Sequence, residues 1–397
     1  MMNKETKEFI HEHAKADVRT LALQAKRYPN IDMPKAITQI AGWQIATHKI
    51  PTWAACDEIL YPVHLSMEQC SSEITARYKK KIIANYPAEH QTLTDLTGGL
   101  GVDCSFMAEA FERVTYVEQQ ETLCQLAKHN FPQLGLQKIT INQGNATDFL
   151  KEMPTVDWIF IDPARRDGHG NKTVSVADCE PNVAELETEL TSKARNVMIK
   201  LSPMLDLTLA LQTLHHVNEV HVVSANGECK ELLLILGEKT TNEIPIHCVN
   251  LLSNGEEQHF CFNKEQENNA ACAYTDQPLK YLYEPHASIL KAGGYRSIAE
   301  QFDLKKLHPN SHLYTSNEWI ANFPGRGFQI NASFGFGKKE LKDAIGNEQK
   351  ANITIRNFPG SVADLRKRLK LSEGGTCYLF ATTLNNGQKI ILKTTKV

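Results

Sequence analysis

Short apolar runs alternate with amphipathic segments through the middle of the chain, and this alternation constrains the fold more than any other feature. Helical patterns such as 121–130 separate the first five runs, which indicates a parallel sheet covered by helices on both faces. Only residues 224–230 separate the last two runs, too few for a parallel crossover, so we expect an antiparallel pair. The seven predicted strands are 92–96, 114–118, 138–142, 156–162, 196–201, 219–223 and 231–236.

The segments on either side of this α/β region have different patterns of apolar and polar residues. Before it, apolar residues recur at intervals of three and four, as at Ile37 and Ile40, which predicts packed helices. After it comes a polar stretch, then a small α/β segment, then a basic ending in which Val362–Leu369 reads as a helix. The predicted regions are an N-terminal helical region at 1–65, an α/β domain at 66–237, a connection or β excursion at 238–280, a small α/β segment at 281–320 and a basic module at 321–397.

Composition narrows the class of protein. With 397 residues, of which 42% are hydrophobic, the chain can form several domains with apolar cores. No run approaches the roughly 18 consecutive apolar residues of a membrane span, and the amino terminus is charged where a secretory signal is apolar. The ten cysteines include no CxxC pair, which favours reduced thiols over disulfides or a zinc site. We therefore expect a cytoplasmic protein with no membrane contact and no metal.

Charge is distributed unevenly along the chain. The net charge is only −3, yet residues 321–397 hold 13 Lys and Arg against five Asp and Glu. A basic terminal module on an acidic body is typical of contact with a polyanion such as nucleic acid. A solvated helix face explains such a run equally well.

A glycine-rich loop follows the first predicted strand and precedes a predicted helix. Glycine lets the backbone turn sharply and approach a ligand closely, and this is where a parallel sheet places its ligand. The dinucleotide fingerprint requires a third glycine three positions after Gly101, but that position is Cys104. The pattern that remains is Asp95 followed by Gly98, Gly99 and Gly101. This loop can accommodate a nucleoside while Asp95 faces a cationic group.

Two further acids stand at successive strand ends. Glu118 ends the second predicted strand, where a carboxylate can accept hydrogen bonds from both ribose hydroxyls. Asp148 follows the third strand, where it can accept from an adenine amino group. Taken singly, each acid is typical of a helix cap or a surface position. Their order at neighbouring strand ends favours an adenosine that carries no phosphate chain.

These motifs resemble the cofactor motifs of class I S-adenosylmethionine-dependent methyltransferases. The resemblance implies a Rossmann-like, seven-stranded α/β fold over residues 66–237, with an antiparallel final pair, and S-adenosyl-L-methionine as the cofactor. The cofactor-binding residues that it implies are Asp95, Thr97, Gly98, Gly99, Gly101, Glu118 and Asp148.

The carboxyl-terminal third resembles the ferredoxin-like segment and THUMP-like module of bacterial methyltransferases. Residues 355–359, 365–369 and 378–382 carry this resemblance. A THUMP-like module implies RNA binding, with rRNA or tRNA as the expected partner, in agreement with the basic charge of residues 321–397. Phe328, Phe334 and Phe336 can stack on unpaired bases, although each alone is more typical of a core residue.

Ser71 and Thr75 lie upstream of the glycine loop, in a segment similar to one in amino methyltransferases and in guanine-N2 enzymes. The resemblance implies that they hold the methionine end of the cofactor. A capping box with Ser72 at the N-cap explains the same spacing equally well.

The fourth predicted strand ends in Asp162 and Pro163, which resemble the Asp-Pro-Pro-aromatic motif of N-methyltransferases. An Asp oxygen that accepts the hydrogens of an exocyclic amine points the nitrogen lone pair at the methyl group. Ala164 and Arg165 depart from that motif, which leaves catalysis open. A salt bridge between Asp162 and Arg165 is the structural alternative.

Three cations are candidate substrate contacts. Arg165 and Arg166 can hold a phosphate or stack on a base, and Lys200 ends the fifth strand beside the same edge. A lysine at a strand end can equally extend into solvent. Cys179 is the one cysteine placed to act as a nucleophile for methylation at a pyrimidine carbon, but a buried or surface thiol is the expected state.

The sequence therefore predicts an S-adenosylmethionine-dependent RNA methyltransferase that acts on a base amine. Asp162 and Pro163 are its predicted catalytic residues. Two alternatives stay open: an RNA-binding protein that has lost catalysis, and a small-molecule methyltransferase whose basic module serves assembly only.

Overall fold

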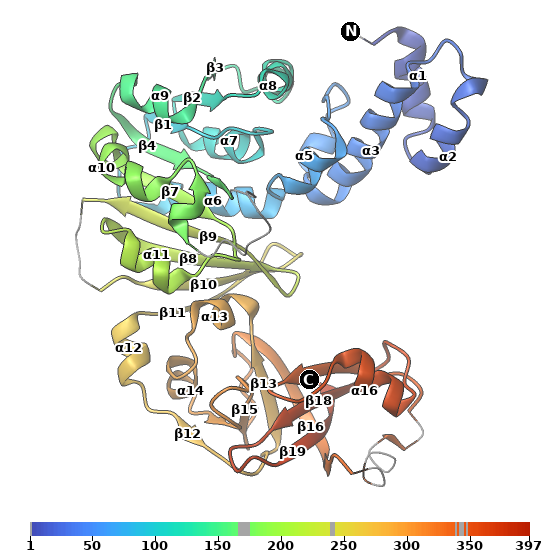
Figure 1. Ribbon diagram of the computed structural model, residues 1–397, viewed down its shortest axis with the longest axis vertical. Coiled ribbons are helices and arrows are strands. Elements are labelled where there is room, and N and C mark those ends of the chain that lie inside the picture. The colour runs from blue at the N-terminus through green and yellow to red at the C-terminus, as the bar shows by residue number, and fades with distance from the viewer. Residues whose placement is uncertain (1, 166–174, 239–242, 338–339, 341–344, 347) are drawn as a thin grey trace. The chain divides into compact units, whose positions relative to one another are not determined.

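The computed structural model describes residues 2–165, 175–238, 243–337, 340, 345–346 and 348–397. The chain forms two compact units: Met1–Asn218 with Leu232–Thr240, and Glu219–Glu231 with Thr241–Val397 (Figure 1). No helix in these described ranges is long and apolar enough to cross a membrane. All ten cysteines are among the described residues, and each is a free thiol.

The first unit begins with six helices. Side chains of Asn3, Asp17 and Asp32 accept hydrogen bonds from backbone N–H groups at the N-termini of the first three, which fixes where those helices start. The fully buried Trp53 belongs to a core cluster that also contains Leu100 and Phe106, so the helices share a core with the segment after the first strand. The helices are α1 (Lys4–Glu12), α2 (Val18–Leu23), α3 (Met33–Lys49), α4 (Pro51–Ala54), α5 (His64–Gln69) and α6 (Glu73–Asn85).

A mainly parallel sheet forms the rest of this unit, with the strand order β9-β7-β4-β1-β2-β3. Its strands are β1 (Thr92–Asp95), β2 (Arg113–Glu118), β3 (Ile139–Gln143), β4 (Val156–Ile161), β7 (Ala194–Leu201) and β9 (Glu228–Gly237). The intervening helices are α7 (Val102–Met107), α8 (Glu121–Gln133), α9 (Ala146–Glu152), α10 (Val183–Lys193) and α11 (Leu207–Thr213). Strand β9 is antiparallel to β7.

The strand ends define one edge of this sheet. In the parallel register Asp95 pairs with Tyr116 of β2 and with Phe160 of β4. The carboxyl ends of β1, β2 and β4 therefore lie side by side. Since Glu118 ends β2 and Asp162 directly follows β4, acidic residues gather along this edge.

The second unit contains β8 (Val217–Ala225) from Glu219 onward, together with β10 (Ile246–Leu251) and β11 (Glu257–Phe262). Strand β10 is parallel to β8 and antiparallel to β11. Asn226 and Gly227 connect β8 to β9, and both have positive φ angles, as a tight two-residue hairpin turn requires. Each of the seven runs predicted as strands thus contains a strand, and the region predicted as a β excursion contributes β10 and β11.

An eight-stranded sheet completes the second unit, in the order β12-β14-β15-β13-β16-β19-β18-β17. Its strands are β12 (Ala273–Tyr274), β13 (Tyr281–Pro285), β14 (Lys305–Lys306), β15 (Tyr314–Ser316), β16 (Gly325–Gly335), β17 (Asn352–Arg356), β18 (Cys377–Thr383) and β19 (Lys389–Lys396). The helices around it are α12 (Lys264–Asn269), α13 (Ala287–Ala292), α14 (Ser297–Gln301) and α16 (Val362–Leu369).

The core of this sheet excludes one of the three candidate stacking residues. Phe328 is fully buried and packs edge-on against Phe380, so it is a core residue and cannot reach a base. Phe336 is half-buried, packs on Phe358 and lies beneath the guanidinium of Arg368. Phe334 is also half-buried.

Candidate functional site

The glycine loop is held in place by its neighbours on β1 and β2. The Asp95 carboxylate accepts a hydrogen bond from the Thr97 N–H at 3.0 Å, which turns the chain at the end of β1. At Gly98 a Cβ would lie 2.1 Å from the ring of Tyr116, so only glycine fits. Gly101 has a φ of +87°, and a Cβ there would lie 2.7 Å from the Phe131 ring. Two loop glycines are therefore required by aromatic packing behind the loop.

Glu118 ties the loop to the end of β2. Its Oε2 accepts from the Gly99 N–H at 2.9 Å, and its Oε1 accepts from the Gln120 N–H at 2.8 Å. The residue is only 8% exposed. Each carboxylate oxygen has a second lone pair, so Glu118 can still accept two further hydrogen bonds. At Gly99 a Cβ would meet nothing nearer than the Thr97 carbonyl oxygen at 3.8 Å, so the loop is open at this residue.

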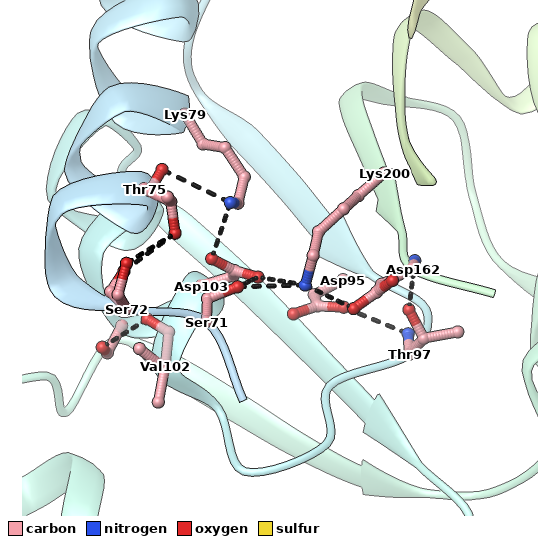
Figure 2. A network of polar contacts seen from close by, with 11 residues as sticks. Ser71, Ser72, Thr75, Lys79, Asp95, Thr97, Val102, Asp103, Asp162 and Lys200 are labelled. Atoms are coloured by element: carbon pink, nitrogen blue, oxygen red, sulfur yellow. Dashed lines mark hydrogen bonds and ion pairs between the residues drawn. The ribbon is translucent and has the colours of Figure 1, made fainter. Parts of the chain in front are cut away.

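Lys200 lies at the centre of a polar network beside the loop (Figure 2). Its Nζ is 2.5 Å from Asp162 Oδ2, 3.1 Å from Asp103 Oδ2 and 3.0 Å from Ser71 Oγ. The Ser71 hydroxyl also donates to Asp103 Oδ2 at 2.6 Å. Only 14% of the Lys200 side chain is exposed. One ammonium group from β7 thus joins the segment before α6, the first turn of α7 and the end of β4.

A second lysine supports the network from α6. Lys79 is fully buried, and its Nζ lies 3.2 Å from Asp103 Oδ1 and 3.3 Å from the Thr75 carbonyl oxygen. A buried ammonium is tolerated only with such partners. Because Lys79 holds both α6 and Asp103, it fixes the start of α6 against α7. This contact places Ser71 and Thr75 beside the loop (Figure 2).

The two buried carboxyls respond differently to this environment. Burial would raise the pKa of Asp103, but the neighbouring ammonium groups of Lys200 and Lys79 outweigh it and lower the pKa to about 2. Burial raises the pKa of Asp95 well above its ordinary value, and the nearby Asp103 and Asp162 add to the increase. The edge of the sheet therefore combines a firmly ionised carboxylate with one that holds its proton more tightly.

The backbone of Asp162 is held by a hydrogen bond, whereas its side chain is partly exposed. Its backbone N–H donates to the Thr97 hydroxyl at 2.6 Å, which ties the end of β4 to the loop. Its side chain is 38% exposed, and the following Pro163 is buried. The Asp162 carboxylate forms an ion pair with Lys200. The salt bridge considered between Asp162 and Arg165 falls on a side chain outside the described residues. The Asp162 carboxylate can therefore meet a ligand at the surface while Lys200 contacts one of its oxygens.

Other predicted site residues lie outside these contacts. Asp148 sits in the first turn of α9, 3.6 Å from Lys151, with 76% of its side chain exposed. Arg165 belongs to the short strand β5 (Ala164–Arg165), which pairs with β6 (Cys179–Glu180). The side chain of Arg165 and the whole of Arg166 lie outside the described residues. Cys179 is fully buried, so it is a packing residue and not an accessible nucleophile.

The capping box predicted as the alternative for α6 is incomplete. Ser72 occupies the N-cap position, but its side chain caps no backbone N–H group. Its hydroxyl is 3.2 Å from that of Thr75, and the Thr75 hydroxyl donates to the Ser72 carbonyl oxygen at 3.0 Å. Ser71, one residue earlier, contacts Asp103 and Lys200 instead.

Sequence reasoning missed two members of the network, Asp103 and Lys79. Asp103 follows the loop by two residues, and a charged residue there is usually solvated. Lys79 lies four residues after Thr75, so helical spacing places both on one side of α6. Lys79 and Asp103 each lie on a buried helix face. A lysine and an acid predicted at such positions indicate a buried ion pair, and this pattern could have identified them.

The chain is similar to known protein families and to solved structures. Residues 281–324 match a family model described as a ferredoxin-like domain, and residues 325–396 match one described as THUMP domain-like. A crystal structure of a "putative methyltransferase" from Porphyromonas gingivalis W83 is 35% identical to the chain, with a TM-score of 0.86. The similarity covers 100% of this chain and 99% of that one. The chain belongs to this methyltransferase family.

Other solved structures match less than half of this chain. An rRNA methylase from Streptococcus thermophilus is 13% identical, covering 41% of this chain and 95% of that one, with a TM-score of 0.31. TrmK from M. capricolum, in complex with S-adenosyl-homocysteine, is 12% identical, covering 42% and 70%, with a TM-score of 0.32. No curated protein matches the sequence significantly. Neither likeness is close enough to assign a substrate.

Proposed function

We propose that this member of the family is an S-adenosylmethionine-dependent methyltransferase that modifies a base amine of RNA, with guanine-N2-like chemistry. The observation that carries the proposal is the set of acids at neighbouring strand ends around an open glycine loop. Asp95 ends β1, Glu118 ends β2 and Asp162 follows β4. The cofactor supplies a methyl group on a sulfonium, and the chain supplies binding and orientation.

The loop and the end of β2 fit an adenosine. Glu118 keeps two free lone pairs that can accept the ribose hydroxyls, and the backbone at Gly99 has room for a ligand. Asp148 lies in the first turn of α9, which follows the neighbouring strand β3, and its exposed carboxylate can accept from the adenine amino group. Ser71 lies just before α6 and Thr75 lies in its first turn. There they would hold the methionine end of the cofactor together with Asp95, Thr97, Gly98 and Gly101.

The acceptor amine is proposed to bind at Asp162. Lys200 contacts one oxygen of Asp162 and also contacts Asp103 and Ser71. The contact with Lys200 uses Asp162 Oδ2, so Oδ1 can accept a hydrogen from an incoming amine while Lys200 stays in place. The buried Pro163 holds the backbone after β4, so the carboxylate is oriented before the acceptor arrives.

The proposed RNA partner rests on the THUMP-like module and its charge. Lys367, Arg368 and Lys370 are exposed at the end of α16. Cations grouped at a helix surface supply the phosphate contacts that dominate nucleic-acid affinity. The half-buried Phe336 beneath Arg368 adds an aromatic surface at the same place. We propose rRNA or tRNA as the substrate, with Arg165, Arg166 and Lys200 closest to the modified base.

Methyl transfer by an Asp162→Asn variant tests the proposal. Asparagine keeps the size of the side chain but removes the charge and one acceptor oxygen. With labelled cofactor and unmodified rRNA and tRNA, we expect the wild type to label RNA and the variant to lose at least a hundredfold in rate, as for other preorganised polar contacts. S-adenosylhomocysteine should still bind the variant. Equal labelling by both proteins would contradict the assigned role.

RNA binding without methyl transfer is a second candidate function, and one observation favours it. The carboxylate proposed to orient the acceptor is already engaged by Lys200 at 2.5 Å. If the folded wild type binds RNA and cofactor but labels no RNA, this second function replaces the first.

A further inference from the structure

Glu219, His221 and His247 meet on one face of the paired strands β8 and β10 in the second unit, and none of them belongs to the site described above. Glu219 and His221 are two residues apart on β8, so their side chains point to the same face. Strand β10 lies beside β8 (Figure 1) and runs parallel to it. His247 pairs with His221 in this register, which adds a third side chain to that face. One ligand atom from each residue lies within 4.8 Å of the other two.

The contacts within this cluster leave one imidazole without a polar partner. His221 Nε2 lies 3.0 Å from Glu219 Oε1, so these two side chains are polar partners of one another. The ring of His247 stacks on that of His221, with centroids 4.7 Å apart and an angle of 19° between the planes. Within the described residues the His247 side chain makes no hydrogen bond. A simple Glu–His pair therefore does not explain why His247 is placed here.

We propose that Glu219, His221 and His247 bind a divalent transition-metal ion, and that zinc is the ion this donor set fits best. Two imidazoles and one carboxylate are a donor set typical of three-ligand zinc sites, in which water takes the fourth position. Ligands about 2.0–2.1 Å from a tetrahedral zinc lie about 3.3 Å apart. The 3.0 Å between His221 and Glu219 is close to that spacing.

Burial supports a defined site over a loose surface cluster. His221 is 10% exposed and Glu219 22% exposed at the side chain, so both are held by their surroundings. Both ligand-bearing strands belong to paired sheet, which keeps the three donors in register. Zinc would take the place of the direct contact between Glu219 and His221 and would give His247 a polar partner. Strand pairing brings together residues 219 and 247, which are far apart in the sequence. The spacing of histidines and acids along the sequence therefore predicts no metal and does not reveal this site.

Zinc binding by the full-length protein tests this inference. The protein is stripped with a chelator, dialysed against zinc and analysed by elemental emission, and its affinity is measured by competition with a chromophoric chelator. We expect one zinc per wild-type chain. His247→Gln and Glu219→Gln should each bind at least tenfold more weakly, while the exposed His215→Gln should bind like the wild type.

Thermal unfolding separates loss of the site from loss of the fold. Zinc should raise the Tm of the wild type and of His215→Gln but not that of His247→Gln, because a ligand stabilises only the state that binds it. Circular dichroism establishes that the variants are folded. The inference is overturned if the wild type retains no zinc, or if His247→Gln and Glu219→Gln bind zinc as tightly as the wild type, which would place the ion on other residues such as the free thiols. Neither result depends on the proposed methyltransferase function.

Discussion

At the scale of single residues, the proposed site is a balance between carboxylates and two lysines. Asp103 is contacted by both Lys79 and Lys200, and its pKa is lowered to about 2. Asp95 is fully buried, and burial together with the nearby Asp103 and Asp162 raises its pKa. The residues therefore make opposite contributions to stability as pH changes.

The free energy of unfolding of an Asp95→Asn variant should show this. Above the ordinary value of 3.8, native Asp95 retains a proton that the unfolded chain has lost, so wild-type stability falls as pH rises toward the native pKa. Asparagine lacks this dependence. Denaturant unfolding at about pH 4 and about pH 7 should show the variant gaining on the wild type at the higher pH.

Asp103→Asn is the matched comparison. Its wild-type carboxylate contributes stability that is present above 3.8 and lost as pH falls toward about 2. The disadvantage of that variant should therefore shrink with acid. A constant difference between Asp95→Asn and the wild type at both pH values would contradict the assigned environment of Asp95.

At the scale of elements, the glycines of one loop are required for different physical reasons. Gly98 and Gly101 lack a Cβ because the rings of Tyr116 and Phe131 occupy that space. Only at Gly99 does the missing side chain leave room on the ligand side. The pattern predicts a turn that only glycine can form, but the aromatic packing depends on β2 and α8 and is visible only in the structure.

A Gly101→Ala substitution should therefore destabilise the protein beyond the effect of its backbone angle. Gly101 and Gly135 have similar φ angles, +87° and +74°. At Gly101 a Cβ would lie 2.7 Å from Phe131, whereas at Gly135 it would meet nothing within 4 Å. In both alanine variants the strained backbone should lower the free energy of unfolding by about 1–3 kcal/mol. Gly101→Ala should lose clearly more free energy of unfolding; equal losses measured with denaturant would exclude the packing role.

At the scale of the whole molecule, the sequence predicts which segments form helices and strands, but it does not predict which side chains from different segments contact one another. The alternation of strands and helices predicts the parallel sheet, and Val362–Leu369 forms the helix expected there. Strand order places Asp95, Glu118 and Asp162 at one edge because parallel strands end together. The network around Lys200 was not predictable in the same way, since Ser71 lies in the segment before α6 and Lys79 lies on α6, both ahead of the sheet in the sequence. Spacing along the chain cannot show which partner reaches a buried ammonium.

Calorimetric titration of the full-length protein with S-adenosylhomocysteine tests the central claim most directly. We expect wild-type binding with a Kd on the order of micromolar. Glu118→Ala should weaken it by about 1–3 kcal/mol, as for lost hydrogen bonds to a charged group. Glu112→Ala, an exposed glutamate just before β2, is the control and should bind like the wild type. Absence of binding by the folded wild type, or equal binding by Glu118→Ala, would contradict the account.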